Sequence, residues 1–308
     1  MKKRLKTEFF ALMAEGERDG SASFQKPSAQ DLLGLPSWPD LTAAALCLQE
    51  LIDDRKPILR NDLLTQYRRH YFENGAHDEN RIWINQELTG FIIDEKSSAV
   101  ATGNELMIDS SNLVRLMPLA FRFARYEAKK PRTIAARYDL IHQLTTLSVG
   151  HRRASVGAGL LVSVANEIIL ARRKIKRTLT ARRLLIALRL AVKKTFDFYN
   201  LQVEYRGETG HYALLQTNRL GRLHLEEAQA RELHHSTYVV DTVLMTLWQT
   251  IQAKSKRQFH NAIKALGLPD VGACCGALLG LAYGTRFKKK RPRPKPESLR
   301  INIQSTIR

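Results

Sequence analysis

Hydrophobic residues recur at every third or fourth position through most of this chain, which is the spacing of an amphipathic helix. Leu41, Ala44, Leu48 and Ile52 show this spacing directly after Asp40, a residue suited to cap the first turn of a helix. The same spacing predicts further helices over residues 61–71, 82–92, 113–125, 133–147, 154–177, 178–199, 225–233, 238–253, 256–266 and 271–283.

Three segments lack this spacing and are predicted to be loops or irregular structure: residues 1–30 apart from a short helical start at Phe9–Met13, residues 94–112 and residues 200–224. The chain has no long alternation of polar and apolar residues and no repeat of fixed period. We therefore predict one compact all-α domain of many helices over residues 1–285, followed by a basic, proline-containing tail over residues 286–308.

The composition is that of a folded chain, because 44% of the 308 residues are hydrophobic. The three cysteines include the adjacent pair Cys274 and Cys275, and they form neither a disulfide framework nor a CxxC zinc pattern. No run of eighteen apolar residues predicts a membrane span, and no long apolar segment follows the basic N-terminus. The expected location is the reducing cytoplasm.

Positive charge is the strongest compositional signal, since the formal net charge is +19. Residues 172–194 contain no acidic residue, and an excess of this kind favours polyanionic partners. The cations from which we expect anion binding are Arg172, Arg173, Lys174, Lys176, Arg177, Arg182 and Arg183, together with Lys288, Lys289, Lys290 and Arg291 of the tail. The expected partner is nucleic acid or a nucleoprotein complex, with an acidic protein second. The alternatives are an anionic lipid surface and a solvated basic face.

Four segments, in order, resemble the ADP-ribosylglycohydrolase family, an all-α family. Gly276-Ala-Leu-Leu-Gly280-Leu-Ala-Tyr283-Gly284 is similar to its glycine-spaced closing helix, where small residues four apart let a second helix pack closely. Tyr238-Val-Val-Asp241-Thr242 resembles the start of its penultimate long helix. Ser110-Ser-Asn112-Leu-Val-Arg-Leu-Met-Pro118 resembles its middle motif, and Pro39-Asp40-Leu41 its first acidic segment. The resemblance extends from about residue 10 to residue 284.

The resemblance implies a pair of magnesium ions held by two acidic segments, and this chain departs from both. Trp38, Pro39 and Asp40 stand where the family has Thr-Asp-Asp, and Pro269-Asp270-Val stands where it has x-Asp-Thr. Magnesium requires oxygen ligands, which tryptophan and proline side chains lack. Asp40 and Asp270 each precede a predicted helix, so the simpler interpretation of both is a helix cap. A metal site and a cofactor are therefore not expected.

These observations lead to a primary hypothesis and two alternatives. The primary hypothesis is a catalytically inactive ADP-ribosylglycohydrolase-like protein that binds nucleic acid, a nucleoprotein complex or an acidic partner. One alternative is a divergent magnesium-dependent hydrolase that uses Asp40 and Asp270 to remove ADP-ribose from protein or nucleic acid. The other is retained binding of an ADP-ribose-like ligand without turnover. The residues expected to line the cleft are Ser110, Asn112, His151, Tyr238 and Asp241.

Overall fold

The computed structural model describes residues 2–21, 40–54, 57–73, 108, 110–125 and 131–285 of the chain. Within these ranges the regular elements are all helices, and Thr217 and Leu223 form an isolated antiparallel bridge. The all-α class predicted from the sequence is confirmed.

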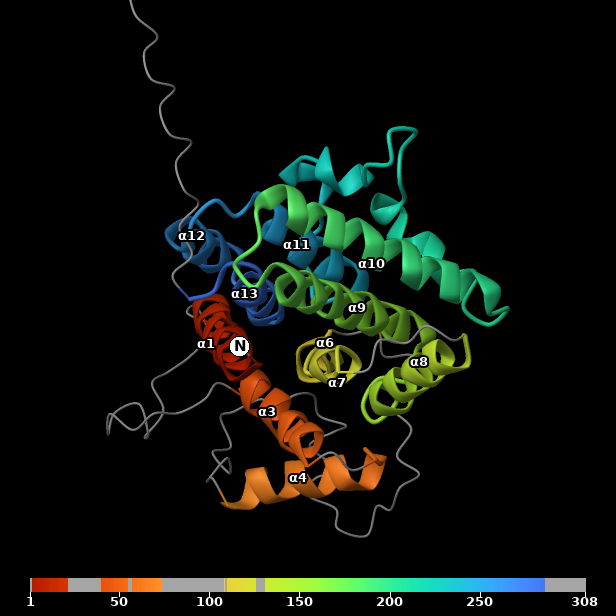
Figure 1. Cartoon of the computed structure of the whole chain (residues 1–308), viewed down its shortest axis with the longest axis vertical. Coiled ribbons are helices and arrows are strands. Elements are labelled where there is room, and N and C mark those ends of the chain that lie inside the picture. The colour runs from red at the N-terminus through yellow and green to blue at the C-terminus, as the bar shows by residue number, and fades with distance from the viewer. Residues whose placement is uncertain are drawn as a thin grey trace, which may run out of the picture.

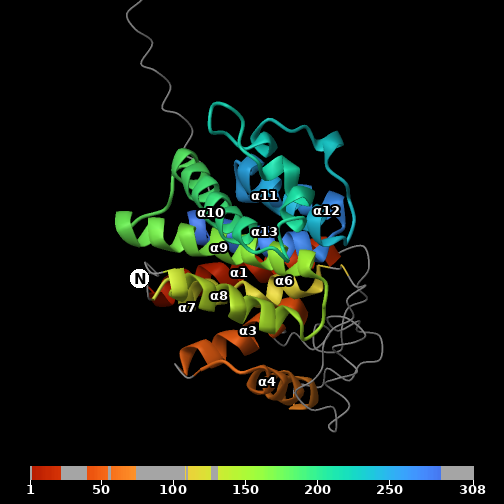
Figure 2. The ribbon, with the colours of Figure 1, turned by 90° about the vertical axis from the view of Figure 1, so that its right-hand side faces the viewer.

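The α-helices are α1 (Lys2–Ser21), α3 (Asp40–Asp53), α4 (Arg60–Glu73), α6 (Ser111–Leu116), α7 (Leu119–Phe123), α8 (Pro131–Thr145), α9 (Arg152–Ile175), α10 (Ala181–Leu201), α11 (Val239–Gln252), α12 (Lys256–Leu266) and α13 (Pro269–Tyr283), as shown in Figure 1. Three short 3-10 helices lie between α10 and α11, at Glu208–Leu215, His224–Glu226 and Ala230–Glu232. Figure 2 shows the layers: α10 and α11 lie on one side of α9 and α13, and α3 and α4 lie beyond α1.

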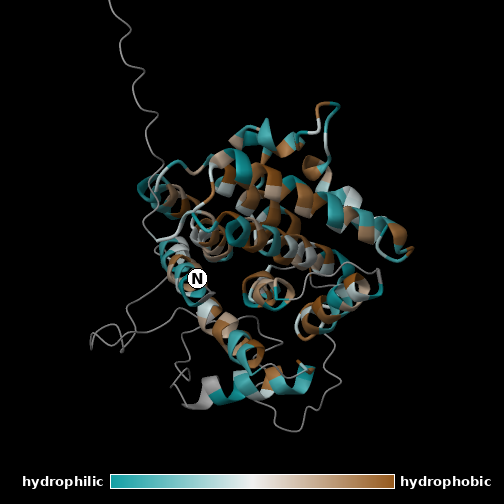
Figure 3. Cartoon of the chain, viewed as in Figure 1, coloured by the Kyte–Doolittle hydropathy of each residue, from teal (hydrophilic) through white to brown (hydrophobic). Residues whose placement is uncertain are grey.

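Helix α9 is the centre of the core and packs against α6, α7, α8, α10, α11 and α13. It is long and apolar enough to cross a membrane, but 83% of its apolar window is buried inside the protein. Its hydrophobicity is therefore that of a core helix in this fold. Figure 3 shows the same pattern in neighbouring helices, where hydrophobic residues gather on the sides that face α9 and polar residues lie outside.

Helices α1 and α13 pack very closely against each other because glycines in these helices lie directly against backbone atoms of the other helix. A Cβ on Gly276 would lie 1.9 Å from the carbonyl oxygen of Leu12, and one on Gly280 would lie 2.2 Å from that of Glu8. Gly16 of α1 and Gly272 of α13 meet in the same way. The close packing predicted for the small residues of the closing helix is confirmed.

The prediction of a mostly irregular segment 1–30 is wrong over α1, which is a continuous helix of 20 residues. Its polar residues have partners elsewhere in the fold: Glu15 pairs with Lys256 at 2.5 Å and Asp19 with His260 of α12. The polar residues of this segment therefore belong to a helix, and some of them pair with residues of α12.

Two further predicted helices differ from the structure. The segment 113–125 is divided into α6 and α7 near Pro118, which has no amide hydrogen to donate to the preceding turn. The segment 225–233 is not one helix, because Glu226 and Glu232 accept hydrogen bonds from the backbone amides of Leu223 and Gln229. The helix predicted over residues 82–92 lies outside the described residues.

Candidate functional site

The carboxylate of Glu17 holds the first turn of α3. Its Oε1 accepts a hydrogen bond from the amide of Leu41 at 2.8 Å, and its Oε2 accepts from the amide and the hydroxyl of Thr42 at 2.8 and 2.7 Å. A carboxylate at a helix start is stabilised by the helix dipole. Asp40 is the first residue of α3, and its side chain lies outside the described part of the structure.

The start of α6 meets the start of α13 through two predicted site residues. The hydroxyl of Ser110, which is fully buried, donates a hydrogen bond to the carboxylate of Asp270. Asp270 lies in the first turn of α13, whose capping position is Leu268 rather than Asp270. Burial raises the pKa of the Cys274 thiol well above its usual value, and the charge of the nearby Asp270 contributes to this.

Asn112 is the one predicted cleft residue whose side chain has no hydrogen bond. It is 0% exposed, and neither its Oδ1 nor its Nδ2 has a partner. A buried amide without partners costs free energy. Asn112 lies in the first turn of α6, so a buried polar group without a partner is present at the start of this helix.

His151 and Tyr238 are brought together by Arg153, a residue that was not predicted to be functional. The Nδ1 of His151 accepts a hydrogen bond from the amide of Arg153 at 3.1 Å and so caps α9. The guanidinium of Arg153 donates to Tyr238 Oη at 2.7 Å and to Glu208 at 2.8 Å. Partial burial lowers the pKa of His151. The only sequence signal for Arg153 was its place next to the cleft candidate His151.

The start of α11 lies against the segment that precedes α6. The amide of Val239 donates to the carbonyl oxygen of Ile108 at 3.0 Å. Asp241 accepts a hydrogen bond from the hydroxyl of Ser236 at 2.6 Å, and this hydroxyl accepts from the amide of Tyr238 at 3.1 Å. The predicted cleft residues therefore lie at linked helix starts. We call the starts of α3, α6, α9, α11 and α13 the helix-start face.

The described residues of the helix-start face do not fit a pair of magnesium ions. No group of three or more His, Cys, Asp or Glu residues in the described ranges could hold a metal ion. Both oxygens of Glu17 accept hydrogen bonds from α3, and Asp270 accepts one from Ser110. These hydrogen bonds fix the orientation of the two carboxylates, and magnesium would need further oxygen ligands beside them.

Of the predicted basic surface, Arg172 is buried and Arg173 is part-buried. Arg172 is 6% exposed; it pairs with Glu8 at 2.8 Å and donates to the carbonyl oxygen of Leu281 at 2.8 Å. Arg173 donates to the carbonyl oxygen of Ala124, and burial lowers its pKa. The expectation that Arg172 binds an external anion is therefore corrected, since its charge is used inside the fold.

The other cations of this block are exposed around the turn between α9 and α10. Lys176 ends α9 with a left-handed backbone, φ 55°, and the amide of Leu179 donates to Ala282 of α13 at 2.8 Å. We call the exposed set the basic corner: Lys174, Lys176, Arg177, Arg182 and Arg183. The tail residues Lys288, Lys289, Lys290 and Arg291 lie outside the described residues.

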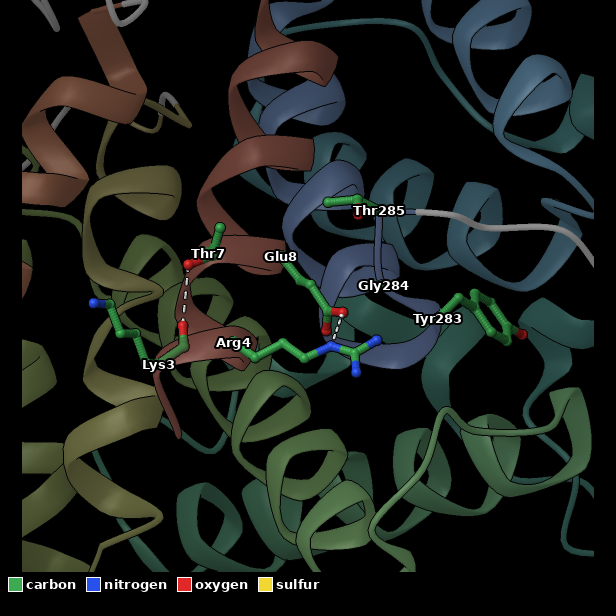
Figure 4. A pocket seen from close by; sticks show the side chains of 7 residues that line it. All are labelled: Lys3, Arg4, Thr7, Glu8, Tyr283, Gly284 and Thr285. Carbon is green, nitrogen blue, oxygen red and sulfur yellow. Dashed lines mark hydrogen bonds and ion pairs between the residues drawn. The ribbon is translucent and has the colours of Figure 1, made fainter. Parts of the chain in front are cut away.

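An open cavity of about 690 Å³ lies at the same end of the molecule, between the start of α1 and the end of α13 (Figure 4). Lys3, Arg4, Tyr283 and Thr285 line it, with Glu8, which pairs with both Arg4 and Arg172. Helix α9 has 24 residues, so its two ends are about 36 Å apart. The basic corner and the helix-start face are therefore separate regions at opposite ends of α9.

Comparisons with known proteins agree with this fold. Thirty-seven chains of solved structures match, among them one described as "ADP-ribosylglycohydrolase-related protein complex". That chain has 19% sequence identity and a TM-score of 0.51, over 92% of this chain and 88% of its own. No curated protein matches the chain. The family model described as ADP-ribosylglycohydrolase matches residues 6–287, from α1 to beyond the end of α13. This chain therefore belongs to the ADP-ribosylglycohydrolase family.

Proposed function

We propose that this protein is a catalytically inactive member of its family that acts by binding, and that nucleic acid binds to its basic corner. The hydrolase chemistry of the family would need carboxylates that are free to hold and orient magnesium ions. The described residues gather no group of three or more acidic, histidine or cysteine side chains that could hold a metal ion, and Glu17 and Asp270 accept hydrogen bonds from α3 and Ser110. The lack of such a group among the described residues supports a binding protein over a hydrolase.

The observation that carries the proposal is that the cations beside the basic corner are paired with carboxylates, whereas, among the described residues, those of the basic corner are not. Arg189 pairs with Glu226 at 2.6 Å, Lys193 with Asp197 at 2.5 Å and Lys194 with Glu167 at 2.7 Å. No ion pair joins any cation of the basic corner to a carboxylate of the described residues. Its charge is therefore available to phosphates, and binding would release condensed counterions.

The test is the salt dependence of binding to a single-stranded RNA and to a DNA duplex of about 20 nucleotides per strand. The triple variant Lys174→Gln, Arg177→Gln, Arg182→Gln is expected to bind at least about tenfold more weakly, with a smaller salt slope, between about 50 and 200 mM salt. The control variant Arg219→Gln, Arg222→Gln, Arg231→Gln removes the same charge elsewhere and should keep most of the affinity. Equal losses in both variants would reject a specific role for the basic corner.

The inactive status has its own test. The protein is incubated with an ADP-ribosylated protein and an ADP-ribosylated oligonucleotide, with magnesium or with EDTA. We expect no release of ADP-ribose in any arm. Magnesium-dependent release that disappears in Asp270→Asn would favour the divergent hydrolase instead.

A second binding function, for an ADP-ribose-like ligand, is favoured by one observation. Asn112, in the first turn of α6, has a buried amide without hydrogen-bond partners on the helix-start face. A ligand that supplies a donor and an acceptor there would remove the cost of burying that amide. Such binding would be independent of the basic corner, at the other end of α9.

A further inference from the structure

Helix α10 exposes two aliphatic side chains on the side opposite its buried face. Leu184, Leu188 and Val192 are buried against the core, whereas Ile186 is 53% exposed and Leu190 is 41% exposed. Ile186 and Leu190 are four residues apart, so their side chains are neighbours on one stripe of the helix. Both side chains are exposed, in contrast to the leucines and valine that α10 buries against the core.

Cations lie at both ends of this aliphatic pair. Arg182 and Arg183 precede Ile186 by one turn, and Lys193 follows Leu190 by one turn. Lys193 pairs with Asp197, but the side chains are 70% and 61% exposed. An exposed pair of this kind is weak and can be exchanged for another acid. We call Arg182, Arg183, Ile186, Leu190 and Lys193 the α10 ridge.

We propose that the α10 ridge is a docking surface for an acidic amphipathic helix of a partner protein. The partner helix carries aliphatic residues spaced four apart, which pack on Ile186 and Leu190. Its acidic residues on either side pair with Arg182, Arg183 and Lys193. This is the helix-to-helix mode of recognition, in which apolar anchors supply affinity and flanking charges set orientation.

The arrangement of charge argues against other occupants. In an antiparallel pair with a second copy, Arg183 would face the partner's Lys193, and like charges would oppose. A nucleic acid backbone offers phosphates to the arginines but no apolar surface for Ile186 and Leu190. A flat anionic membrane would meet Asp197, 61% exposed, on the same stripe as the aliphatic pair.

This proposal goes beyond nucleic-acid binding, and the two can be separated. Lys174, Lys176 and Arg177 belong only to the basic corner, whereas Ile186, Leu190 and Lys193 belong only to the α10 ridge. Arg182 and Arg183 belong to both. A protein partner on the ridge would therefore weaken nucleic-acid binding at the corner by competing for these two arginines.

The experiment uses a fluorescent synthetic helix of about 20 residues, with leucines on one stripe at helical spacing and glutamates on both flanks. Fluorescence anisotropy with the full chain is expected to show binding. The double variant Ile186→Ser, Leu190→Ser is expected to weaken it by at least about tenfold, because the aliphatic anchors are lost. The control variant Val203→Ser, Leu220→Ser also removes two exposed aliphatic side chains, 83% and 75% exposed, away from the ridge. It should bind the peptide like the parent chain.

Three further arms decide between the proposal and its rivals. A peptide with lysine in place of glutamate should not bind, and Lys193→Glu should weaken the acidic peptide. Circular dichroism should show that the surface variants remain folded. The proposal is overturned if the acidic peptide does not bind, or if the double variant binds it as well as the control does. It is also overturned if Ile186 and Leu190 are needed for binding phosphatidylserine vesicles or for self-association, and not for binding the peptide.

Discussion

The guanidinium of Arg172 in α9 forms a buried ion pair with the carboxylate of Glu8 in α1 at 2.8 Å. The side chains are 7% and 6% exposed, and Arg172 also donates to the carbonyl oxygen of Leu281 at the end of α13. One charged residue thus ties three helices together at the end of the fold that carries the basic corner.

The first prediction concerns this ion pair. Arg172→Met should lower the free energy of unfolding by about 3 kcal/mol, because removing one partner leaves a buried charge poorly compensated. The exposed Arg4 still pairs with Glu8, which limits the loss. Urea denaturation of the variant measures it. Lys176→Met, at an exposed position of the same turn, should change stability little, and equal losses in the two variants would contradict the assignment.

The second prediction concerns the crossing of α1 and α13. Gly276→Ala would place a Cβ 1.9 Å from the carbonyl oxygen of Leu12, which is backbone and cannot rotate away. The two helices must separate, so we expect a loss of about 3 kcal/mol or more. Gly210→Ala is the matched control, because a Cβ there meets no atom within 4 Å. Thermal unfolding should show a large decrease only for Gly276→Ala.

The third prediction is a dependence of stability on pH at His142. Burial lowers its pKa to about 4. Its two ring nitrogens contact Tyr199 Oη at 3.0 Å and Tyr205 Oη at 3.3 Å. The unfolded chain protonates this histidine near pH 6.5, whereas the folded chain does so only near pH 4. The stability that His142 contributes to the free energy of unfolding is therefore complete above pH 6.5 and is lost as the pH falls toward 4.

His142 should lower the free energy of unfolding by about 3 kcal/mol as the pH falls from 7 to 4. Comparing unfolding at the two pH values for the parent chain and for His142→Gln tests it, since the variant should lose less stability on acidification. The exposed His224→Gln provides the control. A pH dependence that is unchanged in His142→Gln would show that other groups cause it.

The fourth prediction concerns the buried amide of Asn112. Replacement by leucine, which has a similar volume and no polar atoms, should raise the free energy of unfolding by about 1 kcal/mol. If the amide binds a ligand, the same variant should lose the thermal stabilisation that ADP-ribose gives to the parent chain. Asn166→Leu is the control for ligand binding. Asn166 lies within α9, away from the helix starts, and its side-chain oxygen also lacks a partner. A persisting ADP-ribose response in Asn112→Leu would remove this residue from the ligand site.

The sequence by itself determined the helical class and most of the helices. Helices α9, α11, α12 and α13 lie where the three-to-four spacing predicts them, because that spacing is a local property of the chain. The glycines of α13 and the order of the motifs also indicated the family, which the family model confirms.

Only the tertiary structure decided which polar residues form ion pairs and hydrogen bonds in the interior of the fold. Arg172 and Lys174 look alike in the sequence, yet one is buried against Glu8 and the other is exposed. Glu17 lay in a segment predicted to be irregular, and it caps a helix that starts 23 residues further along. Such partners are set by long-range packing, and local periodicity does not encode which helix end a given charge will meet.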